Sequence, residues 1–267
     1  MVIGVLGCGW LGWPLAKSFI FDEYQVHGST TSVEKLQSLE KDGIKAFNVQ
    51  LKEDENDNGI TPFLKGVDIL IINIPPKLRG NNEESYVNKM HRLHSAMKTS
   101  HVKKMIFVSS TSIYGDIEGE VTEKTKPRPS TESGRQLLAT EKIFWTDPDL
   151  EVTIIRFGGL IGPNRHPVSI LSGKTNLSGG NLPINLIHLN DCIAIIKSVV
   201  FNKWWGEIFN GVYPHHPKKK EYYSAEAIKK GLPKPHYTVE KDKKGKIIAS
   251  FNLINVKKYR FMTPIVG

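Results

Sequence analysis

Three glycines near the start of the chain have the spacing GxGxxG and follow directly on an apolar stretch, residues 2–6. In such a turn the first glycine permits a tight bend, the second lets a phosphate approach the backbone, and the third lets the next helix pack closely on the strand. The free amide groups at the start of that helix attract phosphate. The pattern therefore predicts a dinucleotide-binding turn rather than an ordinary glycine bend. The residues expected to form it are Gly7, Gly9, Trp10, Leu11 and Gly12.

The choice between NAD and NADP depends on the tip of the second expected strand, residues 27–32, which carries hydroxyl groups and no carboxylate. An Asp or Glu about 20 residues after the glycines would favour NAD, because it accepts hydrogen bonds from the ribose hydroxyls. Thr31, Ser32 and Lys35 could instead hold the 2′-phosphate of NADP. In the alternative interpretation, Thr31 or Ser32 caps the following helix and Lys35 is solvated. The sequence favours NADP slightly and leaves NAD open.

The elements that must position this turn alternate between strands and helices along the chain. Continuously apolar runs such as residues 69–72 and 105–108 are typical of strands covered by helices on both faces. The alternation predicts an α/β fold with a doubly wound parallel sheet of the Rossmann type. The expected strands are residues 2–6, 24–29, 44–49, 68–74, 104–109, 152–157 and 207–210. The expected helices are residues 11–21, 32–42, 84–99, 132–145 and 189–202.

Two stretches interrupt the alternation: one is rich in Gly, Pro, Ser and Asn, and the other begins at residue 212 and is rich in lysine. Loops at the carboxyl ends of the strands surround the ligand crevice of a doubly wound sheet, so these stretches should close over the nucleotide. We expect a dinucleotide-binding domain of residues 1–160 and 186–211. The small C-terminal substrate lobe should consist of residues 161–185 and 212–267.

Composition narrows the class of protein. The chain has 267 residues, 39% of them apolar, and contains two cysteines, which argues against a disulfide framework and for a reducing cytoplasm. No apolar run approaches the roughly 20 residues that span a bilayer. The net charge of +9 arises after residue 211, because this part of the chain contains 13 Lys and Arg but 4 Asp and Glu. This excess indicates either a solvated lysine-rich face, which we favour, or a surface for an anionic partner such as nucleic acid.

A family resemblance becomes specific at residues 107–115, which read Phe-Val-Ser-Ser-Thr-Ser-Ile-Tyr-Gly. This segment resembles the strand-to-loop segment of extended short-chain dehydrogenases/reductases, the group that includes sugar-nucleotide epimerases and dehydratases. Residues 156–163, 185–191 and 206–210 are similar to later segments of the same group, so the likeness runs from residue 1 to about 235. The resemblance implies NAD(P), a small-molecule substrate such as a sugar nucleotide, and a homodimer.

The chain departs from that family at its acid/base pair, a Tyr-x-x-x-Lys motif. Ser133 stands where the tyrosine is expected and Leu137 where the lysine is expected, whereas Gly134 and Glu141 are kept. A serine hydroxyl is less acidic and shorter than a phenol whose pKa a neighbouring ammonium lowers, so it cannot take over that role. The sequence resembles an atypical branch of the family. Two functions stay open: an oxidoreductase or epimerase acting on a hydroxyl or carbonyl substrate, and a non-catalytic NAD(P)-binding sensor or partner-binding protein.

Other residues could contact the substrate or replace the missing pair. By resemblance, Ser110 hydrogen-bonds the substrate, although it could equally satisfy backbone groups in a turn. Tyr114 offers a phenol and His166 an imidazole that titrates near neutrality, but a structural tyrosine and a solvated histidine are the alternatives. Arg135 and Arg165 could bind an anion in the crevice or be solvated.

The remaining expectations concern the cofactor, metals and oligomeric state. Asn73 and Pro75 follow the fourth strand, which should end beside the glycine turn and the nicotinamide ribose. By resemblance, Gln50 faces the adenine unless it is a surface residue. The histidine pairs lack a third ligand at a suitable spacing, so we expect no zinc site. Four apolar side chains are either core residues or contacts between protomers: Leu93, Met97, Leu138 and Phe144.

Overall fold

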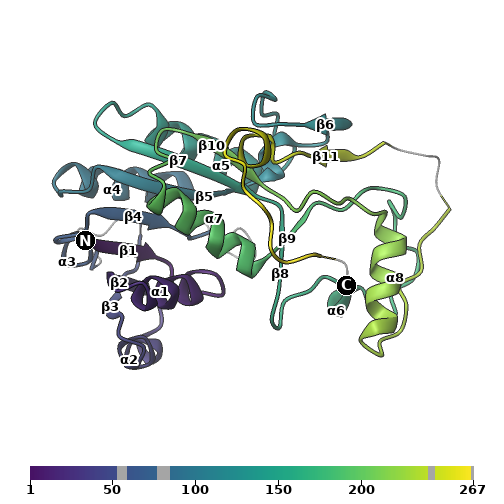
Figure 1. Ribbon diagram of the computed structural model, residues 1–267, viewed down its shortest axis with the longest axis horizontal. Helices are drawn as coiled ribbons and strands as arrows, with labels where there is room; N and C mark the ends of the chain where they lie inside the picture. Colours follow the sequence, from purple (N-terminus) through teal and green to yellow (C-terminus); the bar gives the residue numbers. More distant parts are fainter. Residues whose placement is uncertain (53–58, 77–84, 240–243, 266–267) are drawn as a thin grey trace.

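The protein was analysed as a computed structural model that describes residues 1–52, 59–76, 85–239 and 244–265. Its centre is a sheet of seven parallel strands in the order β10-β7-β5-β4-β1-β2-β3 (Figure 1). All seven correspond to strands predicted from the sequence, which confirms the doubly wound parallel sheet. The strands are β1 (Val2–Leu6), β2 (Gln25–Thr30), β3 (Lys45–Asn48), β4 (Ile69–Ile72), β5 (Lys104–Ser110), β7 (Glu151–Phe157) and β10 (Ile208–Gly211).

The direction of strand order reverses between β1 and β4, which pair in parallel with Val5 opposite Ile71. A crevice opens at such a switch point because the connections on its two sides leave toward opposite faces of the sheet. The carboxyl ends of β1 and β4 therefore mark the place where this fold binds its ligand.

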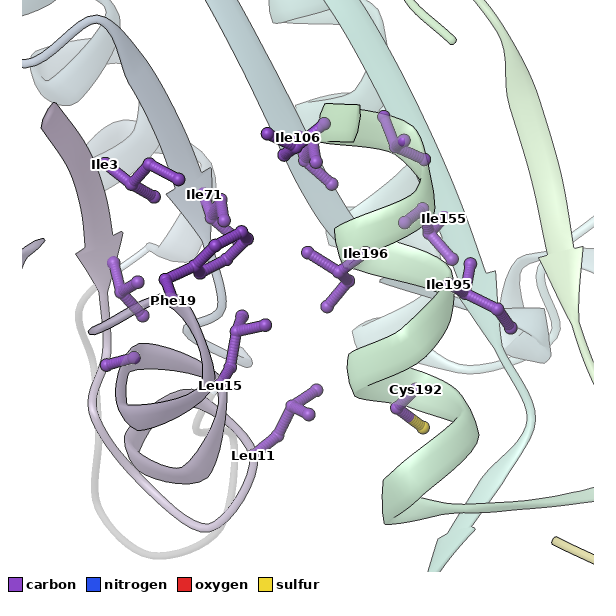
Figure 2. Close-up of a cluster of buried hydrophobic side chains, with 14 of the residues drawn as sticks. Ile3, Leu11, Leu15, Phe19, Ile71, Ile106, Ile155, Cys192, Ile195 and Ile196 are labelled. Atoms are coloured by element: carbon purple, nitrogen blue, oxygen red, sulfur yellow. The ribbon is translucent and has the colours of Figure 1, made fainter. Parts of the chain in front are cut away.

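Helices cover both faces of the sheet. One face carries α1 (Gly12–Phe21), α2 (Leu36–Lys41) and α7 (Leu189–Phe201), and the other carries α3 (Ile60–Leu64), α4 (Tyr86–Lys98) and α5 (Glu132–Trp145). Figure 2 shows Leu15 and Phe19 of α1 on the side of Ile196 of α7, with isoleucines of the strands next to them. The helix expected at 32–42 is a 3-10 turn (Val33–Lys35) followed by α2. Residue 84, the first of the expected helix 84–99, lies outside the described residues.

A smaller region lies beyond the carboxyl ends of the strands, at the right of Figure 1. It contains α6 (Val168–Leu171), α8 (Lys219–Lys229) and two short parallel strands, β8 (Gly159–Ile161) and β9 (Leu186–His188). Its own apolar core includes Val168, Ile184, Tyr222 and Tyr223. Helices α6 and α8 fall within the stretches that the sequence assigns to a substrate lobe, whereas β9 and most of β8 fall in the stretches assigned to the dinucleotide-binding domain.

Two further elements join this region to the sheet. Strand β6 (Gly119–Val121) pairs in parallel with β11 (Lys246–Ile248), and a turn of π-helix, η3 (Asn252–Val256), follows. The last described segment then returns to α7, where the buried carboxylate of Asp191 accepts hydrogen bonds from the amides of Met262 and Thr263. Among the described helices, none is both long and apolar enough to cross a membrane.

Candidate functional site

The glycine turn joins β1 to α1 at the switch point. Gly7 has φ +104°, a conformation that favours glycine, and a Cβ on Gly12 would lie 2.0 Å from the carbonyl oxygen of Gly7. A Cβ on Gly9 would meet no atom within 4 Å. The first and third glycines are thus required by the fold, whereas the space at Gly9 is open to a ligand. This is the division of roles that a dinucleotide-binding turn requires.

Two side chains hold the turn in place. The Gly7 amide donates to Ser29 Oγ at 2.9 Å, and the Asn73 side-chain amide donates to the Gly7 carbonyl oxygen at 3.2 Å. Ser29 lies on β2 and Asn73 directly follows β4, so the strands on both sides of β1 support the turn. Leu11 is buried and points toward α7 in Figure 2, so only its backbone can serve a cofactor.

A first cavity of about 300 Å³ lies at the carboxyl ends of β1, β2 and β4. Four of the residues that the sequence predicts for the cofactor site outside the glycine turn line it, namely Thr31, Lys35, Asn73 and Pro75. The sequence did not single out several other lining residues, because only the fold brings them to this edge. They are Leu6, Cys8, Ser29, Thr30, Val49, Leu51, Ile74, Tyr86, Lys89 and Met90.

Outside the glycine turn, two residues predicted for the cofactor site do not line this cavity, namely Ser32 and Gln50. The Ser32 hydroxyl donates to the Glu34 carboxylate, which lowers the pKa of that carboxyl group. Gln50 is exposed, and its amide donates to Asn48 Oδ1 at 3.4 Å. Their neighbours Thr31 and Leu51 face the cavity instead. Alternation of side chains along an extended segment accounts for this difference of one residue.

A second cavity of about 470 Å³ adjoins the first and shares Gly9, Asn73 and Pro75 with it. It lies at the ends of β5 and β7 and is lined by the hydroxyl-bearing residues Ser110, Ser112 and Ser133. The side chain of Leu137 lies one helical turn beyond Ser133 on α5 and also lines the cavity. Both positions at which the resemblance implies the catalytic pair thus face this crevice.

The chemistry available in the second cavity is limited. Among its described lining residues, Arg165 is the one with an ionisable side chain. Ser110 Oγ accepts a hydrogen bond from the Ser112 amide at 3.1 Å and thereby caps a 3-10 turn, η2 (Thr111–Tyr114). Its own hydroxyl proton can still be donated to a ligand. The described walls can therefore orient a hydroxyl or carbonyl group, but they present no side chain that exchanges a proton near neutrality.

Tyr114 lies in the core rather than on the crevice wall. Its side chain is fully buried, and its hydroxyl donates to Asn210 Oδ1 at 2.8 Å and accepts from Arg156 at 2.9 Å. Burial raises the pKa of this phenol. Arg156 also pairs with Glu141 at 2.7 Å, and Ser109 Oγ donates to the same carboxylate at 2.6 Å. Glu141 thus takes part in a buried hydrogen-bond network, a structural role that does not depend on the acid/base pair.

His166 faces the interior of the smaller region. Its Nδ1 accepts from the Val168 amide at 3.2 Å, so the proton is on Nε2, which lies 3.0 Å from the Tyr222 hydroxyl. Burial lowers the pKa of this imidazole, which favours its neutral form. Arg135 is exposed and pairs with Glu132 at 2.8 Å. His166 and Arg135 line neither the first nor the second cavity. Arg165, also predicted to bind the substrate, lines the second cavity.

A third cavity of about 440 Å³ lies between residues 115–118 and residues 182–186. Three lysines line it, Lys219, Lys244 and Lys246, and the Lys246 ammonium donates to the Gly115 carbonyl oxygen at 2.6 Å. Within the described part of the chain, no cluster of three or more His, Cys, Asp or Glu could hold a metal ion.

Comparison with known proteins identifies the family of the chain. Residues 8–187 match the model of the NAD(P)H-binding family. The protein therefore belongs to the NAD(P)H-binding family, and its fold is that of NAD-dependent epimerases and dehydratases, as the motifs predicted.

Particular relatives extend this result. Protein YeeZ of Escherichia coli K12 is 33% identical over 264 residues, covering 98% of this chain and 96% of its own length. The uncharacterized UDP-glucose epimerase YtcB of Bacillus subtilis is 27% identical over 171 residues, covering 56% of this chain and 54% of its own length. UDP-glucuronic acid 4-epimerase from Bacillus cereus in complex with NAD has the same fold, with a TM-score of 0.81, 18% identity and coverage of 99% of this chain and 93% of its own.

Proposed function

We propose that this protein binds NAD(P) together with a hydroxylated, anionic small molecule of the sugar-nucleotide class, and that it lacks phenol-based acid/base catalysis. The observation that carries the proposal is the pair Ser133 and Leu137 on the wall of the second cavity, beside Ser110. A hydroxyl of ordinary acidity next to an apolar side chain cannot supply the proton transfer that hydride transfer requires. In this proposal the protein still binds the cofactor and the small molecule, but the residues at positions 133 and 137 do not catalyse proton transfer.

NADP is the preferred cofactor in this proposal. Thr31 and Lys35 line the first cavity at the end of β2, where a carboxylate would be needed to favour NAD. An ammonium group attracts a 2′-phosphate, whereas the ribose hydroxyl of NAD gains little from it. The relative from Bacillus cereus is described with NAD, so the preference must come from these side chains of the present chain.

The sugar-nucleotide class is supported by the arrangement of the cavities. Hydroxyl groups line the second cavity, and three lysines line the third, with the η2 turn between them. A ligand with a polyhydroxylated part and a phosphate-bearing part would suit such a pair of sites. UDP-glucose and UDP-glucuronic acid are the probes of choice, because MoeE5, a structural neighbour, is described in complex with each.

The midpoint of thermal unfolding tests the proposal. It is measured with NAD, NADH, NADP and NADPH, each with and without UDP-glucose. A ligand at 100 times its dissociation constant should stabilise the fold by about 2.7 kcal/mol. We expect stabilisation by the cofactors, largest for the NADP pair, and further stabilisation by the sugar nucleotide. Absorbance of reduced nicotinamide in the same mixtures should stay constant. No response to any of the four cofactors would refute the proposal.

One observation favours a second function, a slow oxidoreductase or epimerase. The Ser110 hydroxyl faces the second cavity at the end of β5, where it could orient a substrate carbonyl while water exchanges the proton. Turnover of the cofactor with a sugar nucleotide that is abolished by Ser110→Ala would select this function over a purely binding role.

Oligomeric state and location remain predictions. Leu93, Met97 and Phe144 are buried in the core of the single chain, and Leu138 is half-buried, so a homodimer through α4 and α5 would have to use mainly polar side chains. Sedimentation velocity would test it. Both cysteines are free and buried, which agrees with a reducing cytoplasm.

A further inference from the structure

We propose that Arg165 is a cofactor-binding residue that contacts the pyrophosphate of NAD(P) from the side opposite the glycine turn. The inference rests on the proposed function, because it requires a dinucleotide in the crevice. It adds a binding residue from outside the sheet, and it assigns the guanidinium to the cofactor rather than to the substrate.

The backbone around Arg165 is held in a tight turn. Gly162 and Arg165 exchange two backbone hydrogen bonds, of 2.9 and 3.1 Å, and Asn164 between them has φ +56°. A pair of reciprocal bonds across two residues leaves the turn little freedom. The turn therefore presents the Arg165 side chain in a fixed direction.

This turn is fastened to the glycine turn. The Trp10 indole N–H donates to the Pro163 carbonyl oxygen at 2.9 Å, and a Cβ on Gly162 would lie 3.1 Å from the indole ring. Trp10 is itself one of the residues between Gly9 and Gly12. The loop after β8 and the phosphate-binding turn are thus in direct contact across the top of the crevice.

The guanidinium of Arg165 lies over the face of the Trp10 ring, 4.9 Å from its centroid. Stacking of this kind fixes the plane of the guanidinium and leaves its edge free to donate hydrogen bonds. Arg165 makes no ion pair with a carboxylate among the described residues. It lines the second cavity together with Gly9 and Leu11. In the part of the chain that the structure describes, its positive charge thus has no carboxylate partner.

The cofactor supplies the missing anion. In a GxGxxG turn the pyrophosphate lies against the amides of the second and third glycines and the start of the following helix. Trp10 belongs to that same segment, and the Arg165 guanidinium stacks on its ring. The N–H groups of Arg165 therefore face the region of the phosphate oxygens. Amides on one side and a planar guanidinium on the other would enclose the pyrophosphate, and a fork of N–H donors suits phosphate oxygens.

Binding of three ligands to the purified full chain, measured by calorimetry, separates this role from others. NADP and ADP-ribose contain a pyrophosphate, whereas AMP does not. We expect Arg165→Ala to weaken NADP and ADP-ribose binding by about ten- to a hundredfold, the range for a lost hydrogen bond to a charged group. AMP binding should change less than about twofold. Arg165→Lys should restore part of the loss, because it keeps the charge without the fork.

Controls distinguish the outcomes. Arg260→Ala removes an equal charge from an exposed residue that lines none of the three cavities, and it should leave all three affinities unchanged. If Arg165→Ala binds ADP-ribose as the unaltered protein does, the inference is wrong while the proposed function stands. UDP-glucose is measured in the same way as a fourth ligand. If Arg165→Ala weakens only UDP-glucose binding, the guanidinium belongs to the substrate site and the inference is wrong. Failure of the unaltered protein to bind any pyrophosphate ligand would overturn both.

Discussion

A Cβ on Gly12 would lie 2.0 Å from the carbonyl oxygen of Gly7, whereas a Cβ on Gly9 would meet nothing within 4 Å. The two substitutions should therefore separate folding from binding. Gly12→Ala forces backbone atoms apart and should lower the free energy of unfolding by at least about 2 kcal/mol. Gly9→Ala should leave that free energy within about 0.5 kcal/mol, because its methyl group occupies open space.

Gly9→Ala should nevertheless weaken NADP binding by at least about tenfold, since the added methyl group takes the space that the pyrophosphate needs. Urea unfolding measures the first property and calorimetry the second. Gly66→Ala is not a suitable control, because its φ of +76° would add backbone strain. A stable Gly9→Ala protein that binds NADP normally would show that the phosphates lie elsewhere.

Lys35 should decide the choice of cofactor. Because its ammonium lines the first cavity near Thr31, Lys35→Ala should weaken NADP binding by about tenfold and NAD binding by less than about twofold. Lys41→Ala, on the exposed end of α2 and outside the cavity lining, is the matched control. Equal losses for NAD and NADP would mean that Lys35 does not contact the 2′-phosphate.

The sequence predicted the central sheet because its strands are marked locally. Runs such as residues 69–72 are apolar throughout, and the structure buries all four of these side chains between helices. Strands β6 and β11 could not be found in this way. Each has three residues, and their pairing joins Gly119 to Lys246 across more than a hundred residues. Helix α8 was also missed, since lysines obscure the buried face formed by Tyr222, Tyr223 and Ala227.

The candidate site was predictable to the extent that it depends on backbone geometry. The glycine turn follows from its spacing together with the apolar strand directly before it. The positions of Ser133 and Leu137 follow from a motif. Whether a side chain faces the crevice depends on tertiary contacts, which the sequence does not reveal. His166 and Arg165 are neighbours in one loop, yet one contacts Tyr222 inside the smaller region and the other stacks on Trp10.

Tyr114 is expected to contribute to stability rather than to ligand binding. Tyr114→Phe removes the hydroxyl that links Arg156 to Asn210 in the core, so it should lower the free energy of unfolding by about 1–3 kcal/mol. The dissociation constant for NADP should not change. Tyr24→Phe removes the same atom from a half-buried ring without a described hydrogen bond and should be nearly neutral. Loss of NADP binding in the Tyr114 variant at full stability would contradict this interpretation.

The acid stability of the protein should depend on Asp147, which lies between α5 and α4. Burial alone would raise the pKa of this carboxyl group, but hydrogen bonds from Lys98, the Asp149 amide and His94 outweigh it and lower the pKa from 3.8 to about 2. Because the pKa is lower in the folded state, the stabilisation is fully present above about pH 4. It is lost as the pH falls from there toward 2.

Asp147→Asn tests this dependence. The neutral amide cannot accept from the Lys98 ammonium as strongly, so the variant should lose about 1–3 kcal/mol at pH 7. Between pH 4 and pH 2 its free energy of unfolding should fall less steeply than that of the unaltered protein, and the two curves should converge. Asp149→Asn changes a largely exposed carboxylate bound to the same lysine and should cost much less. Parallel curves for Asp147→Asn and the unaltered protein over this range would show that Asp147 does not carry the acid sensitivity.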